Sequence, residues 1–100
     1  MTEGNCGSMS TELSHHALEK MRSRLARISD VYATLKTPDE VYEDVDHETL
    51  VAVKKVNARS IIVVYREEDG VAKVITLYYT TKLDRLIRAK MVRGAWKKTK

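Results

Sequence analysis

Basic and aromatic side chains that could act on a phosphodiester are spread over the second half of this chain. Cleavage of RNA without a metal ion requires a base for the 2′-hydroxyl proton, positive charge for the phosphorane and an acid for the leaving oxygen. Lysine and arginine supply the charge, and histidine or tyrosine can transfer the protons. The residues that fit these roles in the second half are Lys54, Lys55, Arg59, Arg66, Lys73, Tyr78, Tyr79, Arg85 and Arg88. Any basic domain offers such residues, so their meaning depends on whether the fold gathers them.

The charge of the chain is unevenly distributed. The formal net charge is +4, but residues 82–100 hold eight bases and one acid, which gives +7 and leaves −3 for residues 1–81. Six acids and no lysine or arginine lie between Asp39 and Glu48. The basic end is therefore a candidate surface for a polyanion such as RNA. The alternative is that a lysine-rich end only aids solubility.

Motifs for several other chemistries are absent from the sequence. It contains no G-x-G-x-x-G, P-loop, H-E-x-x-H, G-x-S-x-G or C-x-x-C pattern. His15 and His16 are adjacent and would diverge on a helix, and Cys6 is the only cysteine. We therefore expect no metal site, no cofactor and no internal disulfide.

Apolar spacing predicts three helices. The first starts near Thr11, with Ser10 or Thr11 as its cap, and the second starts at Ser29 and ends at Thr37-Pro38. A third helix follows Thr81 and ends at Gly94. The apolar positions of the first and third helices are Leu13, Ala17, Leu18, Met21, Leu25, Leu83, Leu86, Ile87 and Met91. Trp96, beyond the third helix, either packs back on the domain or stays exposed.

Four strands are predicted between the second and third helices. Residues 41–45 alternate loosely and suit an edge strand, and residues 50–56, 60–67 and 71–80 are dense in Val, Ile, Thr and Tyr. Asn57-Ala58 and Asp69-Gly70 are the turn signals between the last three. The fold class is therefore α+β, with two amino-terminal helices, a four-stranded antiparallel meander and a carboxyl-terminal helix.

Two-residue turns at both positions would fix which side chains share a face of the sheet. One face would be a core face under helices and hold Val51, Val53, Ile62, Val64, Ile75 and Leu77, with Lys55, Arg66, Lys73 and Tyr79 at its margins. The other would be partly open and hold Leu50, Ala52, Val56, Ile61, Val63 and Val74 with Lys54, Arg59, Tyr65, Thr76 and Tyr78. This register places Arg66 opposite Lys73, a mildly unfavourable pair, and a three-residue Glu68-Asp69-Gly70 loop would swap the faces of the last strand.

The length of 100 residues fits one domain. We expect a disordered leader over residues 1–10, a domain over residues 11–94 and a basic tail over residues 95–100. No secretory signal and no apolar run long enough to span a bilayer is present, so a cytoplasmic location without membrane contact is expected.

Several short segments, taken in order, resemble the domain of unknown function 4258 family over roughly residues 14–82. They are residues 16–24, 28–31, 37–41, 63–68 and 74–80. The resemblance implies an α-α-β-β-β-β arrangement related to the RelE and BrnT toxin superfamily, whose better-known members are ribonucleases neutralised by an antitoxin. RelE-like folds also include members that do not cleave RNA.

The resemblance also implies functional positions. A histidine opens the first helix of the family, one or two arginines close it and an aromatic ends the last strand, which match His16, Arg22 or Arg24, and Tyr78 or Tyr79. The chain departs from the pattern at Leu25, where family members commonly have glycine. The basic third helix is a second departure.

These observations support two main hypotheses. The first is a toxin-type RNA-binding protein, with metal-independent cleavage of mRNA as its chemistry and an antitoxin-like protein as a second partner. Its catalytic residues would be His16, Arg66 and Tyr79, and its RNA-binding residues Arg24, Lys54, Lys55, Arg85 and Arg88. The second is a non-catalytic interaction module, monomeric or homodimeric, that docks a protein through the third helix or through the half-polar sheet face, with exposed residues such as Ile61 and Val63. A DNA-binding role is weaker because the chain shows no helix-turn-helix signature.

Overall fold

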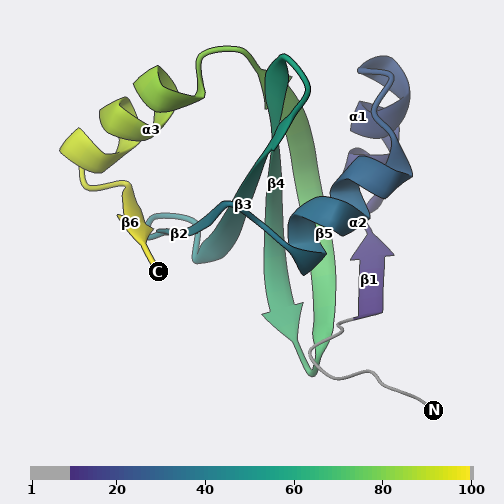
Figure 1. Ribbon diagram of the computed structural model, residues 1–100. Coiled ribbons are helices and arrows are strands. Elements are labelled where there is room, and N and C mark those ends of the chain that lie inside the picture. The colour runs from purple at the N-terminus through teal and green to yellow at the C-terminus, as the bar shows by residue number, and fades with distance from the viewer. Residues whose placement is uncertain (1–9, 100) are drawn as a thin grey trace.

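The computed structural model describes residues 10–99, which form one mixed β-sheet with helices on both faces (Figure 1). The strand order is β1-β5-β4-β3-β2-β6. Among the strands of residues 10–99, β1 and β5 pair in parallel and the other neighbours are antiparallel. The elements are β1 (Ser10–Leu13), α1 (His15–Ser23), α2 (Ile28–Lys36), β2 (Glu40–Asp44), β3 (Thr49–Val56), β4 (Arg59–Glu68), β5 (Val71–Thr80), α3 (Leu83–Val92) and β6 (Trp96–Lys98).

The prediction of a four-stranded antiparallel sheet was wrong, because the sheet has six strands and includes a parallel pair. The three helices and the four predicted strands are present, the latter as β2 to β5. The added strands are the two edges, β1 and β6. Both are short, and the apolar spacing predicts a first helical turn in place of β1 because Leu13 fits the spacing of α1. The described part of the segment expected as a basic tail includes β6, and the expected leader lies outside the described residues except for Ser10, in β1.

Serine 14 decides where α1 begins. Its side-chain oxygen accepts a hydrogen bond from the Ala17 amide at 3.0 Å, so it is the N-cap instead of Ser10 or Thr11. The same hydroxyl donates to the Ile75 carbonyl at 3.0 Å, and the Ser14 amide donates to the Val74 carbonyl at 3.0 Å. These bonds fasten the start of α1 to the middle of β5.

Both predicted hairpin turns contain two residues. Val56 pairs with Arg59, and Glu68 pairs with Val71. Asp69 and Gly70 have φ values of +53° and +77°, and glycine adopts such angles without steric cost. The turn places Arg66 opposite Lys73, as predicted, and the Lys73 ammonium bonds Glu68 at 2.9 Å.

A β-bulge at Ile75 changes the predicted faces of β5. Tyr65 pairs with Val74 and Val64 with Thr76, so Ile75 is left without an opposite residue. Beyond the bulge every side chain of β5 changes face. Leu77 and Tyr79 therefore share a face with Val63 and Ile61, not with Val51 and Val53 as predicted, whereas Tyr78 joins the Val51 face.

Each face of the sheet carries its own core. Beneath α1 and α2, the buried cluster comprises Ala17, Val31, Ala52, Ile61, Val63, Tyr65, Ala72, Val74 and Leu77. On the opposite face, the buried residues Tyr42, Val51, Val53, Ile62, Ala95 and Trp96 pack with Leu83, Leu86 and Ile87 of α3. The face expected to be partly open is therefore covered. Ile61 and Val63, the expected docking residues, are both 0% exposed.

Helices α1 and α3 end in the same way, but with different residues. In α3 the Gly94 amide bonds the Met91 carbonyl and the Ala95 amide bonds the Lys90 carbonyl, which is a Schellman motif with Gly94 at φ +74°. This confirms Gly94 as the residue that ends α3. In α1, Leu25 occupies the equivalent position at φ +51°, and its side chain is 84% exposed.

Tryptophan 96 holds the carboxyl-terminal segment to the sheet. It is 3% exposed and its ring centroid lies 5.5 Å from that of Tyr42. The Tyr42 hydroxyl donates to Glu40 Oε1 at 2.6 Å, and Lys98 Nζ lies 3.0 Å from Glu40 Oε2. None of the helices in residues 10–99 is long and apolar enough to cross a membrane.

Candidate functional site

The predicted catalytic residues do not form one cluster. Tyr79 lies at the end of β5 on the face covered by α1 and α2, and His16 is exposed on α1. Arg66 lies on the opposite face and at the other end of the sheet, where its guanidinium donates to the His47 carbonyl at 3.4 Å. Lys73, which pairs with Arg66, lies six positions before Tyr79 in β5, and six positions correspond to roughly 20 Å of strand. Arg66 and Tyr79 therefore cannot act on one phosphodiester.

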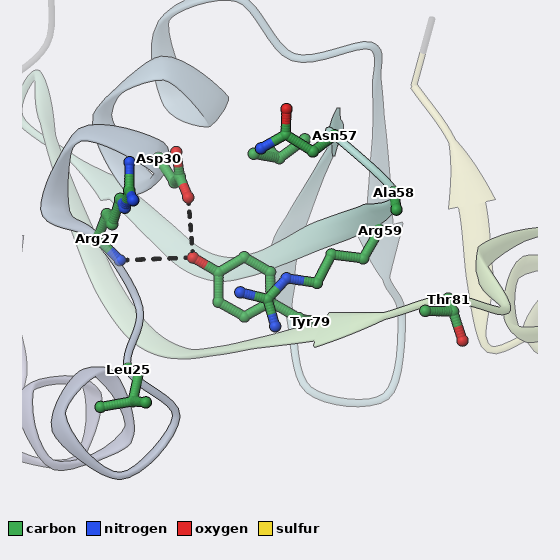
Figure 2. A pocket seen from close by; sticks show the side chains of 9 residues that line it. Leu25, Arg27, Asp30, Asn57, Ala58, Arg59, Tyr79 and Thr81 are labelled. Carbon is green, nitrogen blue, oxygen red and sulfur yellow. Dashed lines mark hydrogen bonds between the residues drawn. The ribbon is translucent and has the colours of Figure 1, made fainter.

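Tyr79 is held by the segment between α1 and α2. Its hydroxyl donates to Asp30 Oδ2 at 2.9 Å and accepts a hydrogen bond from the Arg27 amide at 3.4 Å (Figure 2). The Arg59 guanidinium lies 3.8 Å from the centre of the Tyr79 ring, close enough for a cation–π interaction. The bulge makes this contact possible because it brings Tyr79 opposite Ile61, on the same face as Arg59.

The environment of Tyr79 keeps its hydroxyl protonated. Burial, and then the hydrogen bond to Asp30, raises the pKa of this phenol above its ordinary value of 10.0, although the Arg27 amide and the Arg59 charge oppose the shift. At neutral pH the Tyr79 side chain is therefore a hydrogen-bond donor. It can deliver a proton, but it cannot act as a base.

A pocket of about 300 Å³ surrounds these groups, and we call it the Tyr79 pocket (Figure 2). Residues near the end of α1, the start of α2, the β3–β4 turn and the end of β5 line this pocket. Its lining residues are Leu25, Arg27, Asp30, Val56, Asn57, Ala58, Arg59, Tyr79 and Thr81.

A second hollow of about 520 Å³ adjoins the Tyr79 pocket, and we call it the Lys82 hollow. It shares Ala58, Arg59 and Thr81 with that pocket. Its lining residues are Asp39, Lys55, Ala58, Arg59, Ser60, Thr80, Thr81, Lys82, Leu83, Asp84 and Arg85. Together the two are lined by five bases and three acids, an excess of two positive charges.

The structure gathers part of the predicted RNA-binding set and separates the rest. Lys55 and Arg85 line the Lys82 hollow. Arg88 lines a different hollow between α3 and β2, and Arg24 lies 5.8 Å from the centre of the Tyr78 ring. Lys54 has a structural contact, since its ammonium donates to the Thr37 carbonyl at 2.7 Å at the end of α2.

Four residues that line the two hollows were missed by sequence reasoning or left outside the predicted site: Arg27, Asp30, Arg59 and Lys82. Arg59 follows the predicted Asn57-Ala58 turn, and a bulge-free register already places it near the end of β5. Lys82 follows Thr81, where the third helix was predicted to start. Arg27 and Asp30 reach Tyr79 only through the way α2 packs on the sheet, and the apolar spacing of the helix does not specify which strand residues it meets. Within residues 10–99, no group of three or more His, Cys, Asp and Glu side chains is placed to hold a metal ion.

Comparisons with known proteins match this chain to one family. The family described as Domain of unknown function (DUF4258) matches residues 13–79, which run from the last residue of β1 to Tyr79. Searches of the curated proteins and of the solved structures found no match. Because the match covers more than half of the chain, this protein belongs to the DUF4258 family.

Proposed function

We propose that this chain binds single-stranded RNA across the Lys82 hollow and the Tyr79 pocket. The observation that carries the proposal is the convergence of five bases on two adjoining hollows: Arg27, Lys55, Arg59, Lys82 and Arg85. They come from the α1–α2 segment, β3, β4 and the start of α3, so only the fold brings them together. Phosphate contacts of this kind supply most of the affinity for nucleic acids.

The site has a feature suited to single strands in particular. Unpaired bases stack on aromatic rings and on guanidinium planes, and the Arg59–Tyr79 pair offers such a plane beside the phosphate-binding charges.

Binding is better supported than cleavage. Arg27 and Arg59 can stabilise a phosphorane, and Tyr79 can protonate a leaving oxygen. The third requirement is a base for the 2′-hydroxyl. Asp30 could accept a proton, but the Tyr79 hydroxyl that would serve as the acid already directs its own proton to Asp30 Oδ2. Cleavage is therefore a second measurement in the experiment below, with RNA integrity followed on a denaturing gel.

A relation to RelE and BrnT toxins belongs to the same proposal. Its support is the succession of two helices and four antiparallel strands, α1 to β5, within the matched region. This relation implies an antitoxin-like partner and a cytoplasmic location, where mRNA is encountered. Slowed growth on expression would support the toxin role, and normal growth would argue against it.

The test is fluorescence anisotropy with a labelled single-stranded RNA of about twelve nucleotides, titrated at several salt concentrations. With three to five phosphate contacts, log K should fall with log salt at a slope of about −2 to −3.5, at about −0.7 per contact. Arg59→Ala should weaken binding about five-fold and make the slope less steep by about 0.7.

Arg66→Ala is the matched control. It removes the same charge from the same residue type, on the opposite face and at the far end of the sheet. It should change the affinity less than about two-fold, as expected for a distant surface charge. Equal losses in the two variants would show that binding follows net charge, and the assignment of the site would be withdrawn.

A further inference from the structure

The Tyr79 pocket has the size and the lining of a site for a single base. Its volume of about 300 Å³ is at the lower end of the range of about 300–1,000 Å³ found for ligand pockets. We infer that it holds one nucleobase and that it prefers guanine. This inference rests on the proposed RNA-binding function and specifies what the site recognises.

The flat part of the pocket is formed by two stacked side chains. The Arg59 guanidinium lies 3.8 Å from the centre of the Tyr79 ring, and Figure 2 shows the guanidinium in front of the ring. The Tyr79 ring is held at its hydroxyl, which donates a hydrogen bond to Asp30 and accepts one from the Arg27 amide. A base can therefore stack on the exposed side of the guanidinium without displacing Tyr79.

Leu25 supplies an apolar wall. It lines the pocket, is 84% exposed and adopts φ +51°, a conformation that glycine adopts at lower cost. The backbone of Leu25 is strained, and its large apolar side chain is too exposed to gain much stability from packing. Contact with the face or edge of a bound base would explain why this position carries leucine.

The rim of the pocket supplies the discrimination. The Asp30 carboxylate takes one hydrogen bond from Tyr79 through Oδ2, and a carboxylate can accept about four. Guanine presents two adjacent N–H donors on its Watson–Crick edge, which suit a carboxylate. Adenine presents an acceptor nitrogen at the corresponding place, which a carboxylate repels. Asn57, from the β3–β4 turn, also lines the pocket and can bond the remaining polar atoms of the base.

The position of the pocket fits a base that is still part of a strand. Arg59 lines both the Tyr79 pocket and the Lys82 hollow, so a base in the first would have its neighbouring phosphates beside Lys82 and Arg85 in the second. A free guanine nucleotide carries the same base, so the experiment must separate the two sources.

The test compares two labelled oligouridines that differ only by a central guanosine or adenosine, with GMP and AMP as unlabelled competitors. The wild-type chain should bind the guanosine RNA about ten-fold more tightly than the adenosine RNA, as a well-placed pair of hydrogen bonds discriminates. Asp30→Asn should abolish the preference. Asp46→Asn, which makes the same charge change in the exposed β2–β3 turn, should retain it.

Two further variants keep the inference testable if the Asp30→Asn variant does not fold. Asn57→Ala should reduce the preference without touching α2. Leu25→Ala should weaken binding of both purine-containing RNAs several-fold and leave the preference itself in place. Thermal melts followed by circular dichroism verify that each variant is folded.

The outcomes separate the inference from the proposed function. Equal affinity of the wild-type chain for the guanosine and adenosine RNAs overturns the guanine pocket, while salt-dependent binding weakened by Arg59→Ala leaves RNA binding intact. Competition by GMP but not AMP against the guanosine RNA supports the pocket. Binding of GMP without any RNA binding supports the pocket and refutes the RNA function.

Discussion

Replacement of Leu25 by glycine should stabilise this protein. A residue with a β-carbon loses about 1–2 kcal/mol in the left-handed region, and Leu25 is at φ +51°. Glycine removes that cost but increases the conformational entropy of the unfolded chain, which costs about 0.4–1 kcal/mol. Leu25 is 84% exposed, so the loss of its small buried part costs only about 0.3 kcal/mol. The free energy of unfolding should therefore rise by about 0.5 kcal/mol.

For a domain of this size, 0.5 kcal/mol corresponds to an increase of about 2–4 °C in Tm, which calorimetry or circular dichroism resolves. Leu25→Ala is the matched control because it removes most of the side chain but keeps the β-carbon and its strain. Its Tm should equal the wild-type value or lie slightly below it. A Leu25→Gly variant that melts at or below the wild-type temperature would refute the assignment of strain to this position.

Two other predictions concern Trp96 in β6 and Glu40 in β2, the strand with which β6 pairs. Trp96→Ala should lower the free energy of unfolding by about 3 kcal/mol or more, because it empties the space against Tyr42 beneath α3. Urea denaturation measures this loss. An unchanged midpoint would show that β6 does not contribute to the core. The hydrogen bond from Tyr42, and then the contact with Lys98, lowers the pKa of Glu40 below 4.5. The Glu40 carboxylate therefore stabilises the fold above pH 4.5, and this contribution is lost as the pH falls through the lowered pKa. Glu40→Gln should therefore flatten the acid limb of the stability profile, and an identical acid limb would contradict this account.

Sequence reasoning succeeded where local chemistry decides the structure. The turn signals Asp69-Gly70 and Asn57-Ala58 predicted two hairpins correctly, because short turns admit few residue types. Gly94 predicted the end of α3 correctly for the same reason. It failed at the edges of the sheet. Strands of three or four residues show too few alternations to be told from a helical turn, and their pairing depends on partners far along the chain.

The β-bulge had the largest effect on the site. Residues 74–80 contain apolar or aromatic side chains at both odd and even positions, so either register buries a similar surface and no pattern selects one. Tyr79 was expected on the face of Arg66, and the bulge moves it to the face of Arg59 and Asp30. The resemblance pointed to Tyr78 or Tyr79, but the partners of Tyr79 could be found only from the packed fold.

The family match ends at Tyr79, and this boundary divides the site into two parts. The Tyr79 pocket is built from matched residues with the single exception of Thr81, whereas Lys82 and Arg85 of the Lys82 hollow lie beyond the match. On the proposed function, recognition of a base would belong to the matched core. The segment that leads into α3 would add part of the phosphate-binding charge. Variants at Asp30 therefore test what the family core recognises, and variants at Lys82 test how tightly this particular chain holds it.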